Sequence, residues 1–269
     1  MKRKKQILLL IAFFQLGPNA IYAQFEIKLD EGLFISKISD TVYVVTHYFP
    51  WDSNSLIIKA SDKDVVLIDT PCDTVATSLM LNWIMAILKP QKITAINTGY
   101  HIDNLGGNSS LRQNGIDIFG SDLTIKMIEE RGNKPQLQTL SWLKSPEQDK
   151  YRKAYEGMKF TKPNKIFNAQ EGANLNLGGL SFEIYYPGES HTIDNVVVYI
   201  KEIRLLFGGC MIKSLTSKNL GFTGDANMVE WPNSVKKVQE KYTSAKIVIP
   251  HHGMWGGTGL ILHTLELFH

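Results

Sequence analysis

The chain has few cysteines: only Cys72 and Cys210 occur in its 269 residues. This excludes the framework of several disulfides that holds many small secreted domains together. At most one bridge can form. The sequence leaves open whether the two cysteines pair or whether Cys210 is kept reduced by a metal ion.

The chain also lacks low-complexity tracts, internal repeats and Pro/Ser-rich linkers after its first 23 residues. Its hydrophobic fraction of 43% and charged fraction of 20% are typical of a folded globular protein. Residues 24–269 are therefore predicted to form one domain.

A long hydrophobic run is missing as well. The apolar stretch Ile7–Phe14 is too short to span a bilayer. Four basic residues precede it, a helix break follows at Gly17-Pro18, and the small residue Ala23 suits cleavage. We expect residues 1–23 to be a signal peptide and the mature protein to be periplasmic, without a membrane anchor. An uncleaved anchor is the alternative.

The protein has no strong excess of either charge. The formal net charge is +3, but the predicted signal peptide carries four of the 29 basic residues, which leaves 25 against 26 acidic residues. Nucleic acid is therefore not an implied partner. We expect a monomer whose partner is a small molecule.

Strand-like runs with helical segments between them recur along the chain. The runs are TVYVV (Thr41–Val45), SLIIK (Ser55–Lys59), VVLID (Val65–Asp69), ITAIN (Ile93–Asn97), IDIFG (Ile116–Gly120), LSFEIYYPG (Leu180–Gly188), NVVVYI (Asn195–Ile200), RLLFGG (Arg204–Gly209) and KIVIP (Lys246–Pro250). A helix capped by Asp73 has apolar residues at Val75, Leu79, Trp83 and Ile87, and a further helix is predicted over Glu230–Tyr242. This pattern predicts two packed sheets with helices outside them.

Polar residues with metal-binding chemistry stand directly after several of these strands. They are His101, Asp103, His191, Cys210, His251 and His252. Each is flanked by glycines, which allow several loops to converge on one point. A single histidine after a strand is more often a surface or capping residue. Four such loops together indicate a zinc site built from histidine, cysteine and carboxylate.

Six stretches in this order resemble the metallo-β-lactamases, in the subclass with a cysteine ligand. They are LIDTP (Leu67–Pro71), NTGYHIDNLGGN (Asn97–Asn108), YYPGESHTIDNVVVY (Tyr185–Tyr199), GGCMIKS (Gly208–Ser214), DANMVEW (Asp225–Trp231) and IPHHGMWGG (Ile249–Gly257). The resemblance implies an αββα sandwich of two mixed sheets flanked by helices. It also implies a zinc groove at one edge of the sheets and hydrolysis of the β-lactam ring.

The resemblance further implies two zinc sites. One consists of Asp103, Cys210 and His252. The other keeps His101 and His191 but has Gly99 in place of its third histidine. We therefore expect one tightly bound zinc and a weakened second site. His251 is a less favoured substitute ligand, since neighbouring residues usually point apart.

For catalysis, a mono-zinc arrangement predicts that His101 and Asp103 orient and deprotonate a water molecule. A β-lactamase subclass built in this way favours carbapenems. The resemblance assigns Lys213 to the substrate carboxylate. Phe222 stands where many relatives have an asparagine near the lactam carbonyl.

Three nearby residues have open roles. Trp51 and Phe49 either cover a bound substrate as a flap or pack as a hairpin tip. Asp69 either holds a ligand histidine or serves as a turn carboxylate.

Two other functions remain open at this level. One is a hydrolase of the same fold that acts on another ester, a thioester or a lactone. Glyoxalase-type members of that group have a histidine after the motif aspartate, where this chain has Asn104. The other is a zinc-binding protein with little catalysis, for which Gly99 and Phe222 are the arguments.

Overall fold

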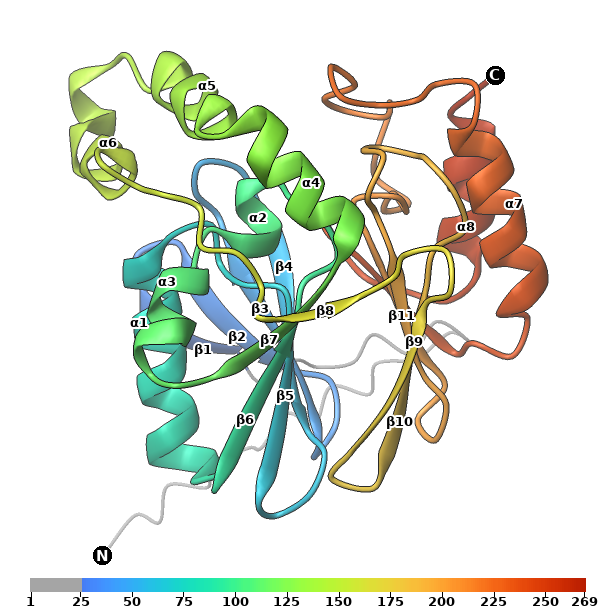
Figure 1. Cartoon of the computed structure of the whole chain (residues 1–269), viewed down its shortest axis with the longest axis horizontal. Helices are drawn as coiled ribbons and strands as arrows, with labels where there is room; N and C mark the ends of the chain where they lie inside the picture. The colour runs from blue at the N-terminus through green and yellow to red at the C-terminus, as the bar shows by residue number, and fades with distance from the viewer. Residues whose placement is uncertain (1–25) are drawn as a thin grey trace, which may run out of the picture.

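The computed structural model describes residues 26–269, so the predicted signal peptide and its cleavage site lie outside the described residues. Two β-sheets pack face to face, and helices cover their outer faces (Figure 1). The predicted αββα sandwich of two mixed sheets is confirmed.

The first sheet has eight strands in sequential order, antiparallel from β1 to β5 and parallel from β5 to β8. Its strands are β1 (Glu26–Asp30), β2 (Leu33–Lys37), β3 (Val42–His47), β4 (Ser53–Lys59), β5 (Asp64–Ile68), β6 (Lys92–Ile96), β7 (Asp117–Ser121) and β8 (Lys165–Phe167). The second sheet has five strands in the order β13-β12-β11-β10-β9, and only β12 and β13 pair in parallel. Its strands are β9 (Ala173–Leu177), β10 (Leu180–Tyr185), β11 (Val197–Ile200), β12 (Leu205–Gly209) and β13 (Ile247–Pro250).

The helices fall into three groups. Those packed around the first sheet are α1 (Thr74–Trp83) with its π-helical extension (Ile84–Leu88), α2 (Ile102–Leu105), α3 (Asn108–Gln113) and α4 (Asp122–Arg131). Those on the second sheet are α7 (Trp231–Lys241) and α8 (Gly259–Glu266). The segment between β7 and β8 also contains α5 (Lys134–Trp142), a 3₁₀ turn (Pro146–Gln148) and α6 (Asp149–Tyr155).

The alternation of side chains along the strands explains why helices cover the outer faces. In β11, Val198 and Ile200 lie in the core between the two sheets. Val197 and Tyr199 point to the opposite face, where they pack with Trp231 of α7. Because both faces of the strand are apolar, both must be covered.

Of the four apolar residues predicted along this helical segment, Leu79 and Trp83 pack against the core and the other two do not. Val75 and Ile87 are each 60% exposed, whereas Met80 and Ile84 are fully buried. Four residues advance a helix by about 400°, so a strict spacing of four drifts around the helix axis. Because of this drift, the first and last residues of the predicted series lie outside the buried face.

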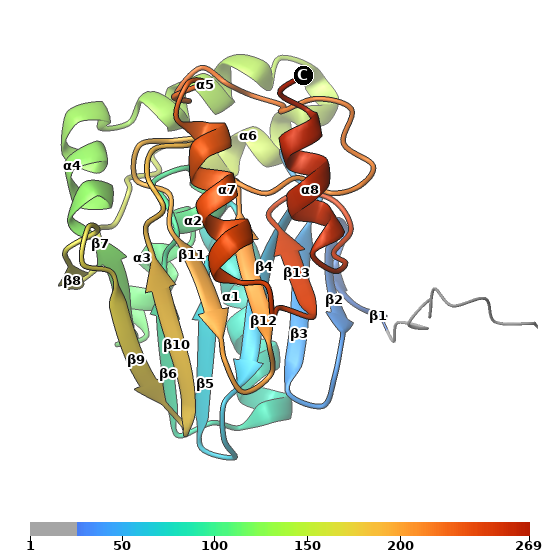
Figure 2. The same cartoon turned by 90° about the vertical axis from the view of Figure 1, so that its right-hand side faces the viewer.

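The loops after β6, β10, β12 and β13 meet at one edge of the sandwich, on the side where α5 and α6 lie (Figure 2). This edge brings together residues that are far apart in the sequence. Among the helices of residues 26–269, none is both long and apolar enough to cross a membrane.

Candidate metal centre

The six polar residues predicted from the strand ends come together at this edge. The ligand atoms of His101, His191 and Cys210 all lie within 4.8 Å of one another, and so do those of Asp103, Cys210 and His251. Cys210 belongs to both groups, so the donors form one continuous cluster.

His252 reaches the cluster through Asp103. Its Nε2 lies 3.4 Å from Asp103 Oδ2. Its Nδ1 donates a hydrogen bond to the backbone carbonyl of Asp52 at 2.6 Å. One ring nitrogen is thus held by the protein and the other faces the cluster, as is usual for a metal-ligating histidine.

His101 is oriented in the same way by a residue that the sequence did not assign. Its Nε2 lies 3.0 Å from Asp225 Oδ2. Asp225 also accepts hydrogen bonds from Tyr100 and from Arg131, the latter at 2.7 Å. The hydrogen bond with His101, followed by the one from Tyr100, lowers the pKa of Asp225 despite partial burial. Asp225 lies in the DANMVEW stretch, but no sequence spacing links it to His101.

Two buried polar atoms in the cluster have no hydrogen-bond partner among the described residues: Asp103 Oδ1 and His191 Nδ1. Leaving such atoms without a partner is costly, and native proteins usually satisfy them. A divalent cation held by imidazole, carboxylate and thiol is the partner that suits these atoms, and that donor set is typical of zinc. The residues present therefore fit the metal that the sequence predicted.

Asp103 is ionised even though it is buried. Burial alone would raise its pKa, but His251, His252 and His101 together with a hydrogen bond from Trp51 hold the pKa at about 2. A carboxylate in this state is ready to bind a cation.

Both cysteines are free and buried, so the disulfide alternative is wrong. Burial, and then the charge of Asp103, raise the pKa of the Cys210 thiol well above its usual value. Cys72 is fully buried and its Sγ lies 3.1 Å from Ser53 Oγ, as expected for a small core residue.

The position of the missing histidine is occupied by a neighbour. A Cβ atom on Gly99 would lie 2.6 Å from Asn195 Nδ2 and 3.2 Å from Asn104 Oδ1. The Asn195 side chain is itself fixed, because its Oδ1 accepts a hydrogen bond from the Thr192 amide at 2.8 Å. The surroundings are therefore packed closely around glycine, and a larger side chain at residue 99 would have to displace the Asn195 amide.

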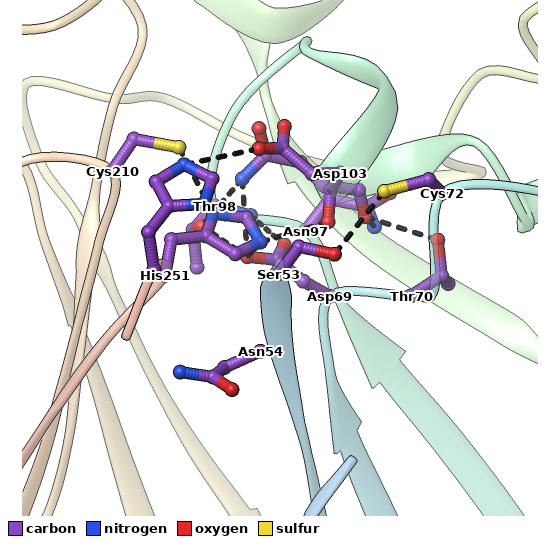
Figure 3. A network of polar contacts seen from close by, with 12 residues as sticks. Ser53, Asn54, Asp69, Thr70, Cys72, Asn97, Thr98, Asp103, Cys210 and His251 are labelled. Carbon is purple, nitrogen blue, oxygen red and sulfur yellow. Dashed lines mark hydrogen bonds and ion pairs between the residues drawn. The ribbon is translucent and has the colours of Figure 1, made fainter. Parts of the chain in front are cut away.

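Asp69 supports the backbone of the metal loop. The alternative in which it holds one of the predicted ligand histidines is wrong. Its carboxylate accepts a hydrogen bond from the Thr98 amide at 2.7 Å (Figure 3). It accepts another from Asn104 Nδ2 at 3.1 Å. Its closest approach to a histidine is 4.0 Å, to His251 Nε2. Burial raises the pKa of Asp69 well above its usual value.

A cleft of about 340 Å³ opens above the cluster. Its lining includes His101, Asp103, His191, His252, Lys213, Trp51, Trp142 and Phe222. The Trp51 indole donates to Asp103 Oδ2 at 3.3 Å and packs edge-on against Trp142, with ring centroids 5.4 Å apart. Phe49 does not belong to this wall, because it is buried and stacks on Tyr151. The flap prediction is therefore wrong for Phe49.

Trp142 was not identified from the sequence. It is the last residue of α5, in the segment between β7 and β8. Its ring lies 6.3 Å from that of Phe222, which in turn lies 6.1 Å from the His101 ring. The sequence signal was an isolated tryptophan in a polar segment, which does not reveal the cleft that it lines.

Lys213 lines the cleft and is only 5% exposed. Its Nζ is 5.2 Å from the centre of the Trp231 ring. Burial lowers the pKa of Lys213 from its usual value, while Cys210 and Asp103 raise it. The predicted substrate-binding lysine thus faces the same cavity as the metal-ligand candidates.

Comparisons with known sequences and solved structures point to one family. The family model described as the metallo-beta-lactamase superfamily matches residues 48–251. A metallo-beta-lactamase type 2 from Bacteroides fragilis is 30% identical over 269 residues, covering 98% of this chain and 95% of the relative. A metallo-beta-lactamase type 2 from Bacillus cereus is 32% identical over 247 residues, covering 90% and 85%. The solved structure of a metallo-beta-lactamase from Pontibacter korlensis has a TM-score of 0.74 and 34% identity, covering 88% of this chain and 98% of that one.

Proposed function

The chain belongs to the metallo-beta-lactamase superfamily, and from this premise we propose a mainly mono-zinc mechanism for its hydrolysis of β-lactam antibiotics. The protein is a β-lactamase, and its family uses a divalent metal. The metal-binding residues in this proposal are His101, Asp103, His191, Cys210 and His252. The observation that carries it is the pair of unpartnered buried atoms, Asp103 Oδ1 and His191 Nδ1, beside a free thiol.

The two ends of the cluster differ in the number of protein ligands that they offer to zinc. Asp103 and Cys210 provide a carboxylate and a sulfur, and His252 adds an imidazole 3.4 Å from the carboxylate. The other end has His101 and His191 but no side chain at residue 99. A site with fewer protein ligands binds zinc more weakly, so we assign the tightly bound ion to the Asp103 end.

A bound zinc supplies Lewis-acid charge and lowers the pKa of water. The residues of the chain position the reactants. Asp225 holds one ring nitrogen of His101, and Trp51 holds Asp103 Oδ2. His101 and Asp103 can therefore accept hydrogen bonds from one water molecule and direct it toward the substrate carbonyl.

Lys213 and Trp51 bind the substrate in this proposal. The Lys213 ammonium group pairs with the β-lactam carboxylate, which fixes the orientation of the ring. Trp51, Trp142 and Phe222 narrow the cleft with aromatic surface. A narrow cleft favours compact substrates, so we propose a preference for β-lactams with small substituents, such as carbapenems.

We also propose that the protein is exported by residues 1–23 and acts as a periplasmic monomer. Neither nucleic acid nor a membrane is a partner in this proposal. Light scattering of the purified protein tests the oligomeric state, and N-terminal sequencing of the secreted form tests cleavage after Ala23.

The function is tested by measuring zinc per chain and turnover of a carbapenem, a cephalosporin and a penicillin. One zinc with turnover restricted to carbapenems supports the mono-zinc proposal. Two zinc ions with broad turnover overturn it. Zinc binding without hydrolysis of any β-lactam would instead indicate another ester, thioester or lactone substrate, or a binding protein.

A further inference from the structure

His251 is a sixth potential donor in the cluster, and it is completely buried. It follows β13 directly, and its backbone amide donates to the Gly209 carbonyl at 3.0 Å. Because β12 and β13 are parallel neighbours, this hydrogen bond fixes His251 beside Cys210. As a result, His251 Nδ1 lies 2.9 Å from Cys210 Sγ (Figure 3).

The orientation of the His251 ring follows from its second contact. Its Nε2 lies 2.8 Å from the backbone carbonyl oxygen of Asp103. A carbonyl oxygen only accepts, so Nε2 carries the hydrogen and Nδ1 has a lone pair in the neutral ring. This arrangement, with one nitrogen held by a backbone oxygen and the other facing potential ligands, matches that of His252 and is typical of metal-ligating histidines.

We propose that His251 is a metal ligand through Nδ1, in a site that it shares with Asp103 and Cys210. The inference rests on the proposed metal centre. It goes beyond the five proposed ligands, because it brings in a nitrogen from the buried side of the cluster.

The distances are compatible with this role. Two ligands at a tetrahedral angle on zinc lie about 3.5 Å apart, given zinc–sulfur and zinc–nitrogen bonds of about 2.3 and 2.0 Å. His251 Nδ1 and Cys210 Sγ are 2.9 Å apart, so a shift of roughly half an ångström would accommodate the ion. The thiol proton is released to solvent when zinc binds, and the thiolate and the Nδ1 lone pair then both bind the cation.

Two further observations support a ligand on this side of the cluster. Asp103 Oδ1 is buried without a partner, in the group of ligand atoms that contains His251. His252 lies nearly parallel to His251, with ring centroids 5.3 Å apart, and it faces the cleft, whereas His251 is enclosed. The cluster therefore has an imidazole on its buried side as well as on its cleft side.

The test is X-ray absorption at the zinc edge on the purified protein loaded with one equivalent of zinc. His251→Phe removes the donor nitrogens but keeps an aromatic ring. We expect this variant to lose one imidazole from the zinc shell. In chelator competition, it should bind zinc more than about 100-fold more weakly than the wild type, which exceeds the effect of losing a hydrogen-bond partner of a ligand. The matched control is His263→Phe in α8, whose ring contacts the Ser217 carbonyl and lies outside the cluster. This control should change neither the number of imidazoles in the zinc shell nor the affinity for zinc.

Loss of an imidazole in His251→Phe supports the inference. An unchanged zinc shell in that variant overturns the inference and leaves the proposed β-lactamase mechanism intact. A wild-type protein that binds no zinc overturns both.

A second measurement covers the case in which His251→Phe does not fold. In wild-type protein labelled with ¹⁵N-histidine and loaded with ¹¹³Cd, we expect a cadmium–nitrogen coupling at His251 Nδ1. Couplings at other histidines without one at His251 overturn the inference.

Discussion

His101 and Asp225 are 124 residues apart in sequence, yet His101 Nε2 lies 3.0 Å from Asp225 Oδ2. His101 also contributes a ligand atom to the donor cluster. Asp225 thus sets the orientation of a proposed ligand without being one itself.

The first prediction concerns this contact. Asp225→Asn should weaken zinc binding or activity by about 10–100-fold, because outer partners of ligand histidines typically contribute that much. Zinc affinity is measured by chelator competition. Arg131→Gln is the control, since Arg131 contacts Asp225 from a partly exposed position and should matter less. Unchanged zinc binding and activity in Asp225→Asn would contradict the role of Asp225.

The second prediction concerns Lys213. Lys213→Met keeps a long buried side chain but removes the charge that we assign to the substrate carboxylate. KM should rise about 10–100-fold, the range of a charge-assisted hydrogen bond of roughly 1.5–3 kcal/mol. Zinc content should be unchanged. Lys218 also lines the cleft but is exposed, so Lys218→Met should have a smaller effect. The reverse order of the two variants would show that Lys213 does not bind the carboxylate.

The third prediction concerns Trp142 of α5. Trp142→Ala should raise KM about 3–10-fold, since an aromatic contact contributes roughly 0.5–1.5 kcal/mol beyond its buried area. Steady-state kinetics and zinc content are measured together. Leu137→Ala on the same helix is the control, because Leu137 is exposed and not part of the cleft lining. If Trp142→Ala and Leu137→Ala have equal KM values, the cleft wall has been misassigned.

The fourth prediction concerns folding of the metal loop. A Cβ atom on Gly106 would lie 2.2 Å from the Cys72 carbonyl oxygen, so Gly106→Ala forces two backbone segments apart. We expect a loss of about 1–3 kcal/mol in the free energy of unfolding, measured with urea. Gly259→Ala is the control, since no atom lies within 4 Å of the added methyl group. It should be neutral or slightly stabilising. Equal stability of the two variants would contradict the tight packing at Gly106.

Much of the fold was predictable because strand-like runs and glycine-flanked polar loops are local signals. The helix cap at Asp73 is an example, and the structure confirms that its side chain accepts from the Ala76 amide. The buried face of α1 was only partly predictable, since the helix is apolar on most sides and local spacing did not distinguish Met80 from Val75.

Parts of the site depend on contacts between distant segments, which local patterns do not encode. The sequence shows two adjacent histidines, 251 and 252, but not which of them points inward. That depends on how β13 pairs with β12. Likewise, Gly99 is visible in the sequence, whereas the Asn195 side chain beside it is a property of the folded chain.

The most direct test of the proposed zinc site is a crystal structure of the zinc-loaded protein with anomalous data at the zinc edge. We predict an anomalous peak about 2.3 Å from Cys210 Sγ and within bonding distance of an Asp103 carboxylate oxygen. A fully zinc-loaded protein whose zinc lies away from both residues would contradict the proposed zinc site.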